Sequence, residues 1–151
     1  MTKKIDFMVE ALRLAESAMV AGEVPVGALI VSEDGDIIAR SENRMHRSKD
    51  ATAHAEMLAI KQALSVIGSS RLTGFDLWVT LEPCAMCAGA ISHARIRRLY
   101  FGAPDVKGGA VEHGPCLFHQ PTIHHKPEIY SGISAAPATA LLQTFFAEKR
   151  D

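Results

Sequence analysis

The feature that most constrains this chain is a pair of short motifs, His54-Ala55-Glu56 and Pro83-Cys84-Ala85-Met86-Cys87. Together they offer one histidine and two cysteines, which are ligands that zinc accepts, and one carboxylate that the metal does not need. Any fold of this chain must therefore bring two distant segments to one point. Three protein ligands leave the fourth position of a tetrahedral site open, and an open zinc site beside a spare carboxylate is typical of hydrolytic enzymes.

Helix geometry limits where each motif can lie. Cys84 and Cys87 are three residues apart, so on a helix they share a face, and in its first turn the helix dipole favours their thiolates. His54 and Glu56 are two residues apart, which on a regular helix would turn them about 200° away from each other. They converge only at a helix start, before the regular helix begins. Residues suited to cap such a helix lie just upstream, namely Asp50 and Thr52.

A purely structural zinc site would need a fourth protein ligand. Composition offers candidates outside the motifs: Cys116, His113, His119, His124 and His125. Structural sites are commonly built from paired ligand motifs, however, and the sequence has no second Cys-x-x-Cys and no His pair with finger-like spacing. A thioredoxin-like redox pair would leave Pro83, His54 and Glu56 unexplained. The sequence therefore favours an open site over a structural or a redox one.

Length and composition indicate one globular domain over residues 1–151, with 48% apolar residues. The net charge of −1 gives no global positive field for nucleic acid, so a polyanion would have to meet a local basic patch, at 44–49 or 95–98. The three cysteines form no disulfide framework, which favours a reducing compartment. No apolar run approaches the roughly 20 residues of a membrane helix, and residues 1–6 lack the pattern of a secretory signal. We expect a soluble, cytoplasmic protein without a membrane partner.

Periodicity predicts four helices and at least four strands. Helical spacing of apolar residues and terminal glycine or proline signals place helices at 5–21, 53–67, 84–94 and 136–149. Apolar, β-branched runs place strands at 24–31, 37–39, 77–81 and 98–102. The first two strands are joined by an Asp34-Gly35 turn, and the last two flank a helix and should be parallel. Residues 41–52 and 103–127 are expected to be irregular. This order predicts a three-layer α/β/α sandwich around one mixed sheet.

His-x-Glu followed by Pro-Cys-x-x-Cys is the signature of the cytidine and deoxycytidylate deaminase superfamily, and the chain resembles that family. Residues around the motifs are similar to those of bacterial tRNA-specific adenosine deaminases. The similar segments are 23–28, 52–56, 79–90 and 101–103, with Asp105, Lys107 and the pair Phe145-Phe146. The resemblance implies a cytidine deaminase-like fold, with a mixed five-stranded sheet and helices on both faces.

The resemblance also implies a function, the conversion of adenosine to inosine by hydrolysis at the wobble position of a tRNA anticodon. One Zn²⁺ per chain would be held by His54, Cys84 and Cys87, and Glu56 would be the catalytic residue that moves protons between water and base. Further residues match substrate-binding positions of the family: Asn43, Ala55, Val24, Asp105, Lys107, His124 and Phe146. The implied partners are a tRNA anticodon stem-loop, whose splayed bases need no strongly basic protein, and a second copy of the chain.

Two other functions stay open on the sequence alone. A deaminase of a free base or nucleoside, of the guanine or cytosine type, would carry nearly the same zinc motif, although the 79–84 segment with Asp105 and Lys107 favours tRNA. A non-catalytic binding module stabilised by zinc is the alternative from a different class. The two differ in whether Glu56 is needed for turnover.

Overall fold

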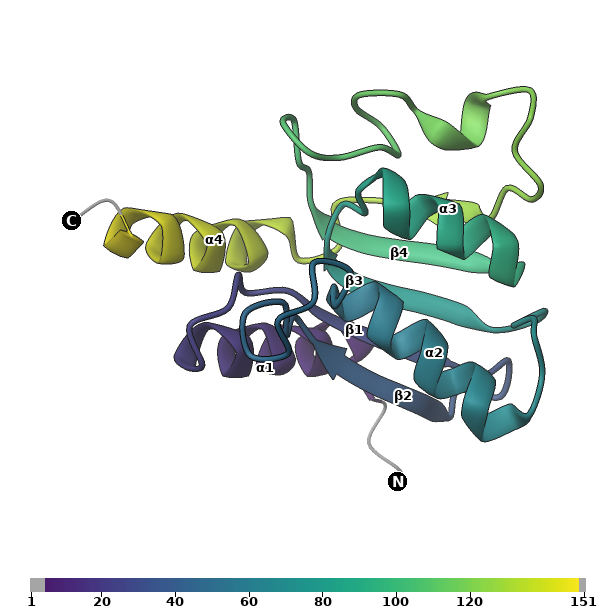
Figure 1. Cartoon of the computed structure of the whole chain (residues 1–151), viewed down its shortest axis with the longest axis horizontal. Coiled ribbons are helices and arrows are strands. Elements are labelled where there is room, and N and C mark those ends of the chain that lie inside the picture. The colour runs from purple at the N-terminus through teal and green to yellow at the C-terminus, as the bar shows by residue number, and fades with distance from the viewer. Residues whose placement is uncertain (1–4, 150–151) are drawn as a thin grey trace.

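Five strands form one mixed sheet between two pairs of helices in the computed structural model, which describes residues 5–149 (Figure 1). The expectation that the first six residues are no secretory signal falls mostly on residues 1–4, which lie outside the described residues. The helices are α1 (Phe7–Val20), α2 (Ala55–Ile67), α3 (Ala85–Ala94) and α4 (Ala135–Lys149). Helices α2 and α3 cover one face of the sheet, and α1 and α4 cover the other. The predicted three-layer α/β/α sandwich is confirmed.

The sheet has the strand order β2-β1-β3-β4-β5. The strands are β1 (Gly27–Val31), β2 (Ile37–Glu42), β3 (Asp76–Leu81), β4 (Arg98–Ala103) and β5 (Glu128–Tyr130). Strand β1 runs antiparallel to β2 and β3, whereas β3, β4 and β5 are parallel. The predicted hairpin and the predicted parallel pair are both correct. The fifth strand, which the resemblance implied and the residue pattern did not locate, is only three residues long.

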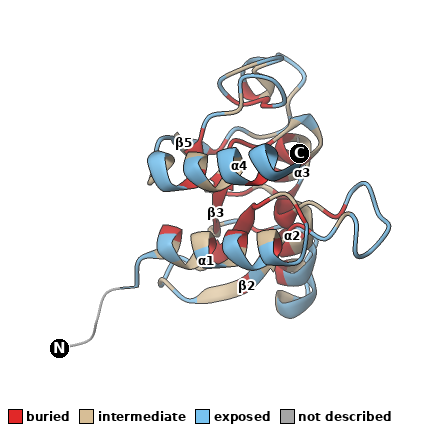
Figure 2. Cartoon of the chain, turned by 90° about the vertical axis from the view of Figure 1, so that its left-hand side faces the viewer, coloured by how far each residue is buried: buried red, intermediate tan, exposed pale blue. Residues whose placement is uncertain are grey.

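Strand β1 is buried along its whole length because helices pack on both of its faces. A Cβ at Gly27 would collide with the Ala11 carbonyl and come within 2.7 Å of Leu14 Cβ, so only glycine allows α1 to lie this close to the strand. Figure 2 shows the buried residues gathered between the helices and the sheet. This packing fixes the end of the sheet at which β3 leads, through residues 82–84, into the site.

Some boundaries differ from those predicted. Strand β1 begins at Gly27 rather than at residue 24, because the Val24 carbonyl accepts N–H groups from Val26 and from the Asn43 side chain instead of joining the ladder. Strand β2 extends to Glu42 and α2 begins at Ala55, so the loop between them lies two residues later than expected. None of the helices within residues 5–149 is long and apolar enough to cross a membrane.

Candidate active site

The site lies where the starts of α2 and α3 meet. His54 is the N-cap of α2, with extended backbone angles of φ −72° and ψ 150°, and Cys84 is the N-cap of α3. Neither side chain makes a capping hydrogen bond, so both can turn toward a metal. The prediction that both motifs lie at helix starts is confirmed. Asp50 does not cap α2, because its carboxylate accepts from the backbone and hydroxyl of Thr52 instead.

Proline is favoured in the first turn of a helix, so Pro83 was expected there in the helix predicted at 84–94. It precedes the N-cap Cys84 and so lies just outside α3 rather than in its first turn. Proline fixes its own backbone and has no N–H to satisfy, which suits a position between a strand and a helix. The strand end, Pro83 and the two cysteines therefore form one short connection that places the sulfurs beside His54.

The three potential ligand atoms have the spacing of a zinc site. His54 Nδ1 lies 3.6 Å from the sulfur of Cys84 and 3.6 Å from that of Cys87. Zinc bonds of about 2.3 Å to sulfur and about 2.0–2.1 Å to nitrogen at tetrahedral angles require an N···S separation of about 3.6 Å. Within residues 5–149 this ligand group contains no fourth His, Cys, Asp or Glu. The residues therefore fit a zinc ion with one open position, and the alternative of a structural site with a fourth ligand from the 113–125 segment is wrong.

Hydrogen bonding and burial tune the ionisable groups of the site. The hydrogen bond between the two thiols lowers the pKa of Cys84 to about 4 and raises the pKa of Cys87. Glu56, in the first turn of α2, is only 4% exposed, and this burial raises the pKa of its carboxyl to about 7. A group with a pKa near neutrality can both accept and donate a proton at that pH, as general acid–base catalysis requires.

A cavity of about 290 Å³ opens onto these residues. Its lining includes three of the residues predicted to bind substrate, Val24, Asn43 and Asp105. The other lining residues include Glu82 and three apolar residues, Val26, Met45 and Leu81. This volume is at the lower end of the roughly 300–1,000 Å³ typical of small-molecule pockets. The cavity therefore suits a small ligand or a single group of a larger one.

The other predicted substrate residue beside the metal, Ala55, has its backbone N–H engaged. This N–H donates to Asn43 Oδ1 at 2.8 Å, and Asn43 Nδ2 in turn donates to the Val24 carbonyl at 3.2 Å. The two bonds fix the orientation of the Asn43 amide, which is 6% exposed. Ala55 thus contributes by holding Asn43 in place.

Besides Ala55, three predicted substrate residues are absent from the lining of this cavity. Lys107 and Phe146 line a second, larger cavity of about 620 Å³ between α4 and the loop after β4. Phe146 is 48% exposed whereas its neighbour Phe145 is buried, as expected if only one of the pair can face substrate. The His124 ring packs 4.8 Å from that of His93, in the last turn of α3, at the far end of that helix from the cysteines.

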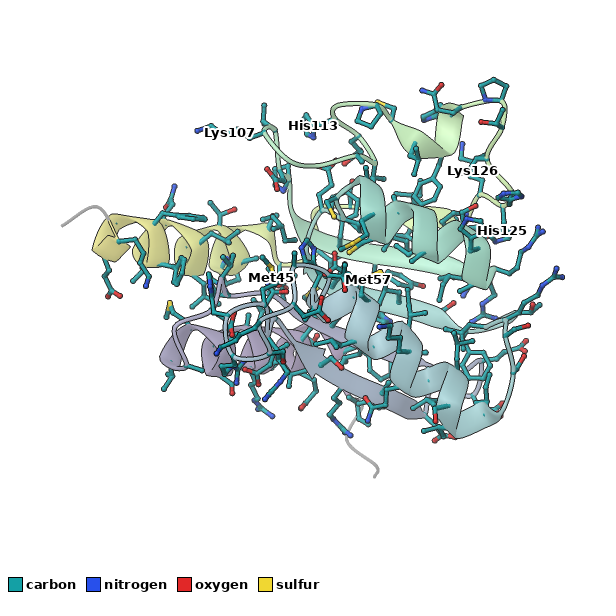
Figure 3. All side chains as sticks on the ribbon, in the orientation of Figure 1. Met45, Met57, Lys107, His113, His125 and Lys126 are labelled. Carbon is teal, nitrogen blue, oxygen red and sulfur yellow. The ribbon has the colours of Figure 1, made fainter. Side chains whose placement is uncertain are left out.

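Two buried carboxylates next to the site were not singled out from the sequence. Glu23 accepts the backbone N–H groups of His46 and Arg47 as well as the Arg47 guanidinium, and so anchors the loop that carries Asn43 and Met45. Glu82 anchors the loop after β4, to which Lys107 and His113 belong (Figure 3). The available signal was an acidic residue at the edge of an apolar run, directly before residues 24–31 for Glu23 and directly after residues 77–81 for Glu82.

The two cationic clusters noted in the sequence are partly neutralised. Arg47 pairs with two carboxylates, Arg97 makes a two-pronged bond to Asp76, and Arg98 pairs with Glu128. These three arginines therefore help to hold strands and loops together. A polyanion would have to compete with carboxylates for them.

Comparison with known proteins agrees with this geometry. Residues 1–103 match the family model of the cytidine and deoxycytidylate deaminase zinc-binding region. The chain is 54% identical over 150 residues to the tRNA-specific adenosine deaminase of Agrobacterium fabrum, covering 99% of this chain and 98% of that protein. A structure from studies of A-to-I editing by tRNA:A34 deaminases matches with a TM-score of 0.88 and 55% identity, over 90% of this chain and 98% of that one. A guanine deaminase from Bacillus subtilis matches with a TM-score of 0.65 and 33% identity, over 96% and 92%.

Proposed function

The chain belongs to the family of the cytidine and deoxycytidylate deaminase zinc-binding region, and from this we propose that it deaminates adenosine to inosine at the wobble position (A34) of a tRNA anticodon. The observation that carries the proposal is the likeness to tRNA-specific adenosine deaminases along nearly the whole chain, with 54% identity over 150 residues to one of them. A likeness confined to the zinc motifs would support deamination without indicating the substrate. The enzyme is therefore a zinc-dependent hydrolase whose substrate is a base in RNA.

His54 Nδ1 and the sulfurs of Cys84 and Cys87 would hold the zinc ion, because their mutual spacing suits it. When bound, the ion supplies Lewis acidity that makes water nucleophilic near neutral pH. Glu56 is the proton carrier: its carboxylate takes a proton from the attacking water and delivers it to the ring nitrogen beside C6. It then takes the second proton from the oxygen that has added to C6 and delivers it to the amine, which leaves as ammonia. Its burial keeps competing water away and holds its pKa in the range that this exchange needs.

The base is positioned by the walls of the small cavity. The Asn43 amide uses one N–H for the Val24 carbonyl, which leaves its second N–H for an acceptor on the base. Ala55 fixes that amide through its own N–H, and Val24 provides an apolar surface for the ring. These contacts together orient C6 toward Glu56 and the metal ligands.

The remaining predicted residues suit the nucleotides that flank the base. Asp105 stands at the edge of the small cavity, and Lys107 and Phe146 stand in the neighbouring one, where a cation and an exposed ring can meet a phosphate and a second base. His124 belongs to a separate region at the far end of α3, so we assign it a contact with a more distant part of the anticodon stem-loop.

The wider expectations follow from the same proposal. Residues 1–151 act as one deaminase domain with one zinc ion per chain, and the tRNA substrate implies a cytoplasmic location. The family resemblance implies a homodimer, and sedimentation of the zinc-loaded protein tests it: a sedimentation mass of one chain at micromolar concentration would contradict the dimer.

The deciding experiment offers the zinc-loaded enzyme an anticodon stem-loop with adenosine at the wobble position, with free adenosine, guanine and cytosine in parallel reactions. We expect inosine in the stem-loop and no turnover of the free compounds. The guanine deaminase relative makes guanine the most informative alternative. Deamination of a free base without inosine formation in RNA would replace this proposal with the alternative function.

A further inference from the structure

A buried carboxylate that takes no part in the proposed chemistry lies between β3 and the metal ligands. Glu82 follows directly on β3 and precedes Pro83, and its side chain has no exposed surface. Its oxygens accept four backbone N–H groups of one loop, at 2.9–3.2 Å, and His113 Nδ1 lies 2.7 Å away. The four N–H donors belong to Asp105, Val111, Glu112 and His113. Such convergence on a buried charge indicates that the carboxylate fixes the loop.

The bond to Asp105 continues into a tight turn. The Asp105 carboxylate accepts the N–H of Lys107 at 3.2 Å and of Gly108 at 2.9 Å, and its carbonyl accepts the N–H of Gly109. A Cβ at Gly109 would lie 2.5 Å from the Glu82 carboxyl group, so the turn closes directly against that carboxylate. Glu82 therefore determines where the whole turn, residues 105–109, is placed.

This turn forms a wall shared by the two cavities. Asp105 and Gly108 line the small cavity together with His54, Cys84, Glu56 and Glu82 itself. Lys107, with the preceding Pro104, lines the larger cavity against α4. A displacement of this turn would move the wall of the small cavity relative to the wall of the larger cavity. The distance between a base in the small cavity and its neighbours in the larger one depends on this turn.

We infer that Glu82 is a positioning residue for RNA binding, which sets the 105–109 turn so that the base and its flanking nucleotides engage both cavities at once. The inference rests on the proposed function and deepens it. Within residues 5–149, every hydrogen bond of the Glu82 carboxylate goes to the 105–113 loop. Loss of the Glu82 carboxylate should therefore displace the wall formed by the 105–109 turn and leave the proton carrier Glu56 in place.

The test is a double-mutant cycle between Glu82→Gln and Lys107→Ala, with KM and kcat measured on the anticodon stem-loop. The amide of glutamine presents an N–H group where the carboxylate accepted one, so at least one loop donor loses its partner. We expect KM for the stem-loop to rise about tenfold or more, and Lys107→Ala to add little in the Glu82→Gln background. Zinc content should stay at one per chain, and kcat should fall much less than KM rises.

Glu23→Gln is the matched control, because Glu23 is equally buried and anchors the opposite loop by the same kind of bonds. A general loss of stability would act equally in both variants, whereas only Glu82→Gln should be coupled to Lys107→Ala. Additive effects of Glu82→Gln and Lys107→Ala, or an unchanged KM, would overturn the inference.

Gly109→Ala serves if Glu82→Gln fails to fold, since it displaces the turn while leaving the carboxylate in place, and the same coupling to Lys107→Ala is expected. Wild-type protein, measured in the same series, distinguishes a failure of the proposed function from a failure of the role of Glu82. If the wild type forms no inosine, the proposed function fails. If the wild type forms inosine but the cycle is additive, only the role of Glu82 is refuted.

Discussion

Replacement of Glu56 by glutamine tests the central assignment, because it removes the proton carrier and changes almost nothing else. Glutamine has nearly the same shape, so the cavity should keep its form. The three ligand atoms belong to other residues, and the variant should therefore bind one zinc ion per chain. Binding of the stem-loop should also be retained, since the Asn43 and Val24 contacts are untouched.

The size of the effect follows from burial. General acid–base catalysis by one side chain contributes about 10²- to 10⁴-fold to a rate. Glu56 is only 4% exposed, so bulk water cannot readily replace it, and its pKa of about 7 lets the same group accept and donate protons at neutral pH. We therefore expect the upper end of the range, a fall in kcat of about 10⁴-fold, equal to about 5.4 kcal/mol of activation free energy at about 1.36 kcal/mol per tenfold.

The assay measures inosine in the stem-loop under single-turnover conditions, with zinc content and RNA affinity determined on the same samples. Glu16→Gln, at an exposed position on α1, is the control for glutamine substitution itself and should keep wild-type turnover. Loss of zinc in Glu56→Gln would show that Glu56 is a ligand. Retention of more than about one hundredth of wild-type kcat would show that another group carries the proton, and either result refutes the reasoning.

The other predictions concern the metal, the packing and the response to acid. Cys87→Ala removes a ligand and should abolish stoichiometric zinc binding, so full zinc content by elemental analysis would contradict the ligand set. Gly27→Ala should lower the free energy of unfolding by about 1–3 kcal/mol through overpacking against α1, as measured by urea unfolding. Gly89→Ala meets no atom within 4 Å in α3 and should raise that free energy by up to about 1 kcal/mol, unless a partner chain packs there, in which case the dimer dissociates more readily. Burial alone would raise the pKa of Glu23, but bonds from Arg47 and its neighbours outweigh burial and lower it, so the unfolded state binds more protons and this stability is lost as pH falls below about 4.5. Glu23→Gln should flatten that acid limb of the unfolding curve.

Much of the fold follows from local patterns in the sequence. Helical spacing and turn residues located all four helices and four strands, and the strand–helix–strand order required β3 and β4 to be parallel. Strand β5 was not predicted because three residues at the edge of the sheet are too few to show an alternation of apolar and polar side chains. The start of β1 was misplaced since an apolar Val24 looks like a strand residue, whereas its carbonyl serves the Asn43 side chain.

The chemistry of the site was easier to predict than its walls. Helix geometry alone required His54 at a helix start, and the structure places it at the N-cap of α2. The roles of Glu23 and Glu82 depend on backbone N–H groups more than 20 residues away, at 46–47 and 105–113. Such long-range bonds leave no spacing pattern in a sequence. The separation of His124 from the metal likewise depends on the path of an irregular loop.

The division of the ligands between two helices has a consequence for how the protein acquires its metal. Cys84 and Cys87 are one helical turn apart, so a nascent chain can offer both thiolates before any tertiary structure forms. His54 lies 30 residues earlier than Cys84 and joins them only after α2 has docked beside α3. Metal loading should therefore occur in two stages, a weak capture by two sulfurs and a tight closure by the imidazole. Chelators would remove the ion far faster from partly folded chains than from fully folded ones. The rate at which a chelator removes zinc would therefore report whether α2 has docked beside α3.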